Sequence, residues 1–172
     1  MDSLYVHENG VGFRKAEKTD AKSLLDLKNE SWFGTHTVTL ANLASQEKWL
    51  ESISYETHCP RNLVLMASNG PITFGIFKIL NVDWQSRKAE VGWDIFKCNR
   101  GKGLGKKLVK AGVDFAFEVL NLRRLDAQIL VTNQRSLACA QASGFEIEGT
   151  QRRAIFKKNE YIDNLLLGLL RQ

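Results

Sequence analysis

Residues 99–107, with the sequence NRGKGLGKK, place three glycines and four cationic side chains within nine positions. Glycine lets the backbone approach a ligand closely, and the first N–H groups of a helix form a binding site for phosphate. Arg and Lys side chains add charge-assisted hydrogen bonds to phosphate oxygens. This segment therefore predicts the binding of an anionic ligand that carries phosphate groups.

The spacing of these residues excludes two common phosphate-binding loops. A Walker A loop starts with glycine and ends in Gly-Lys followed by Ser or Thr, but here the first position is Arg100 and the last is Lys107. A dinucleotide-binding fingerprint begins well at Gly101 and Gly103, but Lys106 stands where its third glycine belongs. What remains is the pattern R-x-x-G-x-G, which suits a loop between a strand and a helix.

The residues on either side predict that strand and that helix. Residues 87–96 alternate between apolar and polar side chains, which is typical of a half-buried strand. After the loop, apolar residues recur at intervals of three or four and predict a helix of ~17 residues with one apolar face. The apolar face consists of Leu104, Leu108, Ala111, Phe115 and Val119.

The rest of the chain predicts alternating strands and helices. In order, they are a strand at 11–16, a helix capped by Thr19 or Asp20, a helix from about 40 to 53, strands at 62–68 and 72–80, a strand at 124–131, a short helix at 136–143, and a hairpin of strands 145–157 and 161–170. This order predicts an α/β fold with a mixed central sheet of about seven strands and flanking helices. The glycine loop should lie near the centre of that sheet.

Composition limits the class of protein. A chain of 172 residues with 44% hydrophobic content suits a single domain spanning residues 1–172. The net charge of +5 is scattered along the chain and does not predict nucleic-acid binding. Cys59, Cys98 and Cys139 lack the spacing of a zinc site and favour a reducing cytoplasm. The first residues do not resemble a signal peptide, and the apolar run at 165–170 is too short to span a bilayer. We therefore expect a soluble cytoplasmic protein with no metal, nucleic-acid or membrane partner.

Two motifs together resemble those of the GNAT acyl-CoA N-acyltransferases over almost the entire chain. Arg100-x-x-Gly103-x-Gly105 is similar to the R/Q-x-x-G-x-G/A loop of that family, and TNQRSLACAQASGFEIEG at 132–149 is similar to its N-x-x-S, then G-F, segment. AEVGWDIF at 89–96 and the C-terminal hairpin further resemble the RimJ/RimL-like branch, whose members acetylate protein N-termini and small amines. The resemblance implies the GNAT fold, in which acetyl-CoA is wedged between two splayed central strands, here 87–96 and 124–132.

The resemblance also implies a set of residues that bind acetyl-CoA. Backbone N–H groups of residues 101–105 would hold the pyrophosphate, in agreement with the anion site expected at a helix start. Asn133 and Ser136 would hydrogen-bond the pantetheine, although Asn133 is also a good N-cap and the two roles can coexist. The full predicted set is Trp93, Ile95, Arg100, Gly101, Lys102, Gly103, Leu104, Gly105, Lys106, Asn133 and Ser136.

Acyl transfer to an amine needs a base, because an alkylamine with a pKa of about 10 is almost entirely protonated at neutral pH. Glu90 lies on the polar face of its predicted strand, and the matching position carries the general base in the histone-acetylating branch of the family. A carboxylate partly desolvated beside a cleft would act directly or through a water molecule. The alternative is an ordinary strand glutamate that faces solvent.

The sequence departs from the family pattern at the general acid. Many members carry a tyrosine seven residues after the asparagine, and this chain has Ala140 there. We expect Ser136 to replace it, with Tyr161 and solvent as the alternatives. A covalent route through Cys139 is disfavoured, because no base can be placed beside that thiol.

The sequence gives only a broad prediction of the residues that bind the acceptor amine. Trp32, Phe33 and His36 lie between the first two helices, where the family builds its acceptor pocket, and Trp84 lies in another loop. These side chains either line that pocket or cap the core from outside. The expected activity is direct transfer of acetyl from acetyl-CoA to a primary amine, either a protein N-terminus or a small metabolite, by a monomer or homodimer.

Two alternatives stay open. One is an N-acetyltransferase for amino sugars or sugar nucleotides. The other is a CoA-binding module that no longer catalyses, which the substitution at Ala140 favours and the presence of Glu90 opposes.

Overall fold

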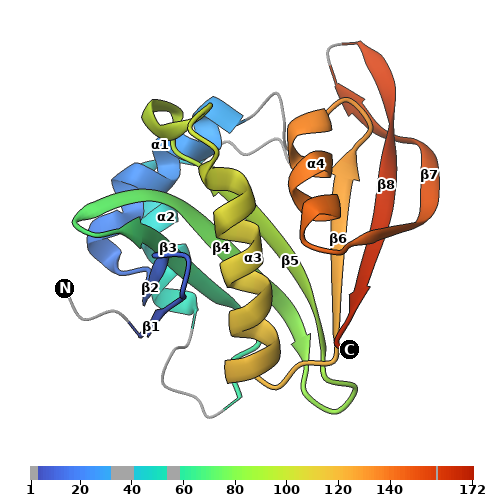
Figure 1. The fold of residues 1–172 in the computed structure, drawn as a ribbon. Helices are drawn as coiled ribbons and strands as arrows, with labels where there is room; N and C mark the ends of the chain where they lie inside the picture. Colours follow the sequence, from blue (N-terminus) through green and yellow to red (C-terminus); the bar gives the residue numbers. More distant parts are fainter. Residues whose placement is uncertain (1–3, 32–40, 54–58, 158) are drawn as a thin grey trace.

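A computed structural model of the chain describes residues 4–31, 41–53, 59–157 and 159–172 (Figure 1). These residues form an eight-stranded sheet in the order β1-β2-β3-β4-β5-β6-β8-β7. The strand that the sequence did not predict is β1 (Tyr5–Val6), which pairs antiparallel with β2 (Gly12–Lys15). Two residues are too few for periodicity to reveal, because a period-two pattern needs several alternations.

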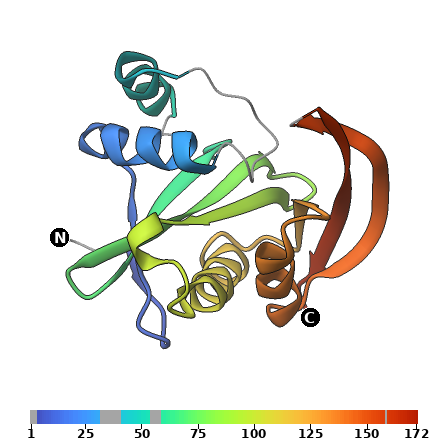
Figure 2. The same ribbon diagram turned by 90° about the horizontal axis from the view of Figure 1, so that it is seen from above.

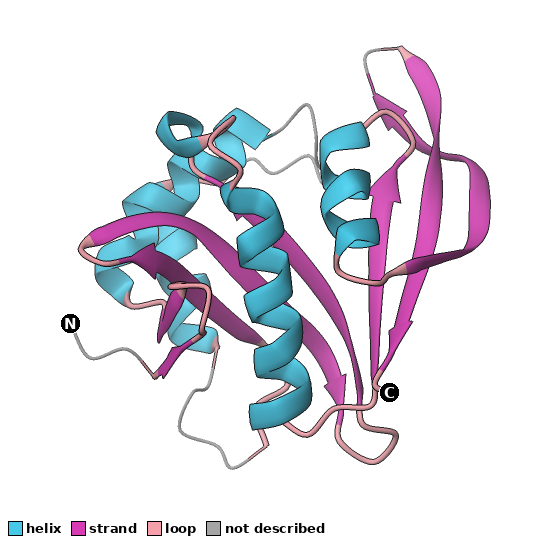
Figure 3. Ribbon diagram, in the orientation of Figure 1, coloured by secondary structure: helices cyan, strands magenta, loops and turns pink. Residues whose placement is uncertain are grey.

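The other strands are β3 (Leu63–Asn69), β4 (Ile72–Asp83), β5 (Lys88–Ile95), β6 (Arg124–Leu130), β7 (Glu146–Lys157) and β8 (Glu160–Leu170). The helices are α1 (Ala21–Ser31), α2 (Leu43–Ser52), α3 (Leu104–Asp114) and α4 (Gln134–Ala142), with short helical turns η1 (Lys18–Asp20) and η2 (Lys97–Asn99). A π-helical turn, η3 (Phe115–Val119), continues α3. The predicted α/β fold with a mixed sheet and flanking helices is confirmed (Figure 3).

The centre of the sheet contains one parallel pair, β5 and β6, and it is incomplete. The pairing joins Lys88–Glu90 to Arg124–Asp126 and stops there. Residues 91–95 of β5 stay paired with β4, and residues 127–130 of β6 stay paired with β8, but the two segments do not pair with each other. The two strands diverge from this point (Figure 1). A gap between them therefore opens toward the loop that follows β5.

Helices cover both faces of the sheet. α1 and α2 lie on one face, and α3 and α4 lie on the other (Figure 2). Each face has its own core cluster, with Leu24, Leu27 and Met66 in the first and Phe77 and Leu108 in the second. The sheet is thus a rigid layer that holds the diverging strands in place between two buried apolar surfaces.

The apolar face predicted for the long helix is correct except at its end. Leu108 and Ala111 are fully buried, whereas Val119 is 53% exposed. The cause is the π-helical turn, in which Leu120 N–H donates to the Phe115 carbonyl. A turn of this kind adds a residue to the helical repeat and shifts the apolar face, so that Phe117 is buried instead of Val119.

The predicted cap at Thr19 or Asp20 is wrong, because the turn η1 precedes α1 and its N-cap is Glu17. Asp20 is instead the third residue of this turn and completes the capping box. Its carboxylate accepts a hydrogen bond from the Glu17 N–H at 2.8 Å and two from the Arg14 guanidinium, each at 2.7 Å. Asp20 is buried and therefore needs these partners. The cluster ties β2 to the start of α1.

Candidate active site

The glycine loop has the backbone geometry that its sequence predicts. Gly101 has φ +78° and Gly103, the residue before α3, has φ +72°. Residues with a side chain rarely adopt these angles, so glycine is required for the turn into the helix. A Cβ atom built on either glycine would meet no atom within 4 Å. The outer surface of the loop is therefore open, and a ligand can approach its backbone and the first N–H groups of α3.

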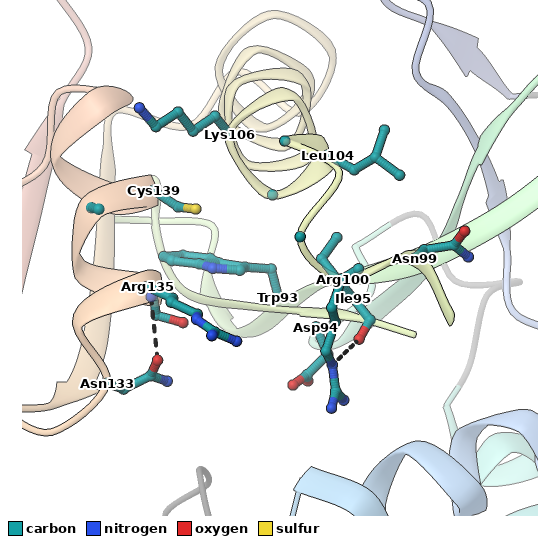
Figure 4. A pocket seen from close by; sticks show the side chains of 15 residues that line it. Trp93, Asp94, Ile95, Asn99, Arg100, Leu104, Lys106, Asn133, Arg135 and Cys139 are labelled. Atoms are coloured by element: carbon teal, nitrogen blue, oxygen red, sulfur yellow. Dashed lines mark hydrogen bonds between the residues drawn. The ribbon is translucent and has the colours of Figure 1, made fainter. Parts of the chain in front are cut away.

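A cleft of about 570 Å³ lies in front of this loop, and we call it the loop cleft (Figure 4). Its walls are the end of β5, the loop with the start of α3, and the first turns of α4. The structure brings together around this cleft every residue of the predicted cofactor-binding set except Lys102. The sequence reasoning missed Asp94, Asn99, Arg135, Ala138 and Cys139, which also line it.

Two cationic side chains of the loop make contacts within the chain. The Lys102 ammonium donates to Asn99 Oδ1 at 3.3 Å, and Lys102 does not line the cleft. The Arg100 Nε donates to the Ile95 carbonyl at 2.9 Å (Figure 4). Arg100 thereby ties the loop to the last residue of β5. The guanidinium nevertheless remains in the wall of the cleft.

Asn133 caps α4, as the sequence allows. Its side-chain oxygen accepts a hydrogen bond from the Ser136 N–H at 3.2 Å (Figure 4). This contact fixes the first turn of α4 and holds Ser136 at the edge of the loop cleft. The capping role of Asn133 and its place in the wall of the cleft therefore coexist.

Cys139 lies where α3 and α4 come closest. A Cβ atom on Gly105 would lie 2.9 Å from Cys139 Sγ, so only glycine allows the two helices to approach this closely. Burial raises the pKa of the Cys139 thiol, and the nearby charge of Lys106 only partly opposes this effect. The thiol therefore stays protonated at neutral pH, which supports the view that it is not a nucleophile.

A second cavity of about 270 Å³, the strand cavity, lies where β5 and β6 diverge. Lys78, Leu80, Glu90, Gln128 and Leu130 are among its walls. Cross-strand partners share a face of the sheet, and the pairs Lys78–Gly92, Leu80–Glu90 and Glu90–Asp126 place this set on one face. That face is opposite to the one on which Val91 packs into the core with α3.

The loop cleft and the strand cavity meet at four residues. Trp93, Asp94, Asn133 and Ser136 line both of them. The Trp93 ring projects from the end of β5 toward α4 (Figure 4) and stacks on Phe77 with ring centroids 6.5 Å apart. The gap between the diverging strands thus connects a surface suited to phosphate with a cavity that holds a carboxylate.

Of the two carboxylates in the strand cavity, Asp94 is paired with a lysine and Glu90 is not paired with any described residue. The Lys78 ammonium lies 3.1 Å from the Asp94 carboxylate, so these two groups compensate each other. Glu90 is half-buried in the same wall, and no described residue hydrogen-bonds to its carboxylate or forms an ion pair with it. A half-buried carboxylate with no protein partner is suited to accept a proton from a bound ligand.

The structure places the candidate side chains for the general acid differently. Ala140 is fully buried in the core. Tyr161 is 64% exposed near the turn between β7 and β8, where it packs against Phe156, and it lines neither the loop cleft nor the strand cavity. Of the side chains that the sequence proposed, Ser136 is the one that lies at the junction of the two cavities.

Of the predicted acceptor residues, Trp84 is the one that lies within the described part of the chain. Trp32, Phe33 and His36 lie outside the described residues. Trp84 packs against the main core, and its indole N–H donates to the Pro60 carbonyl at 3.1 Å. It lines neither the loop cleft nor the strand cavity, so its position fits the alternative of a core-capping side chain.

Membrane-spanning helices and metal-binding clusters are both absent from the described residues. In this part of the chain, no helix is long and apolar enough to cross a membrane. In the same residues, no three His, Cys, Asp or Glu side chains are grouped so as to hold a metal ion.

The fold and the site together define a protein that can hold a phosphate-bearing ligand on a helix start and deliver its far end into a gap beside a carboxylate. Comparison with known proteins gives this class a name. A family model for the acetyltransferase (GNAT) domain matches residues 13–166. The chain belongs to this family and is an N-acetyltransferase of the GNAT type.

Individual relatives are distant. The uncharacterized N-acetyltransferase p20 of Bacillus licheniformis is 24% identical over 181 residues, which cover 100% of this chain and 98% of that protein. The putative ribosomal N-acetyltransferase YdaF of Bacillus subtilis is 32% identical over 98 residues, which cover 57% of this chain and 54% of that protein. The RimJ/RimL-like branch stays a prediction.

The solved structures that resemble this chain include the spermidine N-acetyltransferase of Vibrio cholerae in complex with CoA and spermine. The TM-score is 0.85 at 19% sequence identity, and the match covers 95% of this chain and 96% of that chain. At this identity the likeness establishes the fold.

Proposed function

We propose that this protein transfers the acetyl group of acetyl-CoA directly to a primary amine, either a protein N-terminal amine or a small amine-bearing metabolite. The loop cleft would bind the coenzyme and the strand cavity the amine. One observation carries this proposal: the two cavities meet between the diverging strands β5 and β6, with Glu90 on the amine side. When bound, acetyl-CoA supplies an acetyl group activated as a thioester.

The residues of the loop cleft fit the coenzyme. The open surface over Gly101 and Gly103 lets a diphosphate reach backbone N–H groups, and the start of α3 adds the positive end of a helix dipole. Lys106 and Arg135 bring positive charge to the same wall. Asn133 and Ser136 offer polar atoms to the amide groups of the pantetheine arm.

Glu90 would act as the general base. The carboxylate has no partner among the described residues, so it is available to take a proton from the acceptor ammonium, directly or through one water molecule. The cavity is small and half-enclosed by the sheet, which weakens the competition from bulk water.

Ser136 would assist departure of the thiol. Its hydroxyl is a donor at the junction of the two cavities and is held there by the cap that Asn133 makes. A thiolate with a pKa of about 8.5 is a tolerable leaving group, so a hydrogen bond can replace full protonation. This explains how the chain can do without a tyrosine at Ala140.

The named relatives support an amine acceptor without choosing one. One relative is named as a putative ribosomal N-acetyltransferase, and one structural neighbour was solved with CoA and spermine. For this chain, both a peptide N-terminus and a small amine belong to the proposal, as does the cytoplasmic location favoured by its three cysteines.

The test is release of CoA thiol from acetyl-CoA with a mixed library of primary amines, followed by mass analysis of the product. We expect one or more amines to gain an acetyl group. Calorimetry with CoA runs beside it. Binding of CoA with no transfer to any amine would favour the non-catalytic CoA-binding module, and no binding of CoA would contradict both.

A further inference from the structure

A buried asparagine holds two exposed glutamines, one of which lines the strand cavity. Asn164, on β8, is only 1% exposed. Its Nδ2 donates to Gln128 Oε1 at 2.9 Å and to Gln151 Oε1 at 3.1 Å. An amide nitrogen carries two hydrogens, so both are used and both glutamine carbonyl oxygens are held as acceptors.

The hydrogen bond from Asn164 to Gln128 leaves the Gln128 NH₂ group as a donor in the wall of the strand cavity. Gln128 follows Asp126 by two residues and therefore shares the face of the sheet on which Glu90 lies. Its carbonyl oxygen is held by Asn164, so the side chain offers its NH₂ group, which can only donate, to the cavity that it lines. No described residue accepts a hydrogen bond from that group.

The charges of this face do not suit a polycation. Among the described residues that line the strand cavity, the ionised side chains are Lys78, Glu90 and Asp94, and the first is paired with the last. Once Glu90 has received the first ammonium, a second ammonium on the ligand would find no unpaired carboxylate among the described residues of this cavity.

We infer that the acceptor is a primary amine with a single positive charge and a hydrogen-bond-accepting oxygen a few bonds from its nitrogen. Gln128 recognises that oxygen and Glu90 receives the proton. Pairing of Asp94 with Lys78 leaves no second carboxylate among the described lining residues for a polyamine. This inference rests on the proposed function and narrows its substrate class to amines such as α-amino amides and amino sugars. The inferred acceptor differs from spermidine, for which structural neighbours of this chain are named.

Three amines of matched design test the inference on the full chain with acetyl-CoA. Glycinamide carries the carbonyl oxygen, isobutylamine has the same branched shape without it, and spermidine carries further charges. Rates are expressed per concentration of unprotonated amine, because the three pKa values differ. We expect kcat/KM for glycinamide to exceed that for each of the others by about tenfold or more. Glucosamine, with hydroxyl oxygens, distinguishes the two sources of the accepting oxygen.

Two substitutions of Gln128 test whether this residue causes the preference for glycinamide over isobutylamine. Gln128→Leu removes the donor, and we expect the preference for glycinamide over isobutylamine to fall about tenfold. Gln128→Glu keeps the bond from Asn164 but replaces the donor with a carboxylate, so spermidine should gain relative to glycinamide. The matched control is Gln151→Leu, which loses the other bond from Asn164 but lines neither cavity and should keep the preference.

A further variant tests the charges. Lys78→Met leaves Asp94 unpaired, and kcat/KM for spermidine should rise about tenfold. Lys22→Met, which breaks an exposed ion pair with Asp26 on α1, is the control for loss of one positive charge.

The outcomes separate this inference from the proposed function. Faster turnover of spermidine than of glycinamide by the parent chain overturns the inference while the proposed function stands. If Gln128→Leu and Gln151→Leu show the same preference for glycinamide over isobutylamine, the inference is also overturned while the proposed function stands. If no amine is acetylated, the proposed function fails, and calorimetric titration of the three amines into CoA-saturated protein still decides the preference.

Discussion

The loop cleft and the strand cavity differ in the groups that they present to a ligand, mainly backbone in the first and side chains in the second. The loop cleft presents backbone: two glycines with positive φ and the starts of α3 and α4. The strand cavity presents side chains that strand pairing brings together from β4, β5 and β6. The first region should therefore be sensitive to changes in backbone conformation and the second to single functional groups. Each prediction below tests one side of this contrast.

The largest effect should come from the base in the strand cavity. Glu90→Gln removes the proton acceptor and keeps the shape, so kcat/KM should fall about 100-fold or more while the affinity for CoA stays unchanged. Steady-state kinetics and calorimetry measure the two quantities. Parent-like activity would remove Glu90 from the mechanism and leave it a solvent-facing strand residue.

A backbone change should affect the other region. Gly103→Val forces a β-branched residue to φ +72°, and the loop must relax at a cost of about 1–2 kcal/mol, so the affinity for CoA should fall about 5- to 30-fold. Gly70→Val is the matched control. Gly70 has φ +58° and open space in the turn between β3 and β4, so it carries similar strain away from both cavities.

Equal losses of CoA affinity in Gly103→Val and Gly70→Val would mean that general destabilisation explains the result. Thermal unfolding of both variants, measured beside the calorimetry, shows whether their stabilities are matched.

Ser136 lies at the junction of the two regions and should give an intermediate effect. Ser136→Ala removes the hydroxyl donor while the backbone N–H that Asn133 caps is kept. We expect kcat to fall about tenfold, and to fall less with a thioester whose thiol is more acidic. If Ser136→Ala turns over acetyl-CoA as fast as the parent, solvent is the better candidate for the proton donor.

The smallest effect should come from a side chain of the loop cleft. Cys139→Ala should change kcat/KM less than about twofold, because the thiol is kept protonated by burial and takes no part in the chemistry. Alkylation rates provide a second test. At neutral pH, Cys139 should react more slowly than the exposed Cys59 and Cys98. A trapped acetyl-cysteine would overturn the direct-transfer route.

The same contrast explains what the sequence could predict. The loop is one contiguous segment. Glycine at a strand-to-helix junction indicates a backbone conformation that other residues rarely adopt, so the sequence alone identifies Gly101 and Gly103. The alternation in β5 and the apolar face of α3 likewise follow from local periodicity. The divergence of β5 and β6 came from the family resemblance and not from spacing.

The parts that escaped prediction depend on long-range contacts. Lys78 and Gln128 lie on β4 and β6, and only the pairing register places them around one cavity and brings Asn164 of β8 against Gln128. The exposure of Val119 depends on one π-helical hydrogen bond that no apolar pattern reveals. The sequence left Trp84 either to line the acceptor pocket or to cap the core, and its hydrogen bond to Pro60 and its packing against the core fit the second role.

The central claim is that the coenzyme and the amine meet in the gap between β5 and β6. The most direct measurement is a crystal structure with a bisubstrate conjugate in which CoA is joined through an acetyl bridge to glycinamide. We predict the diphosphate on the N–H groups of residues 101–105, the bridge between the diverging strands, and the amine nitrogen within one hydrogen bond or one water of Glu90. A bridge that lies outside the gap, with Glu90 remote from the nitrogen, would contradict the account.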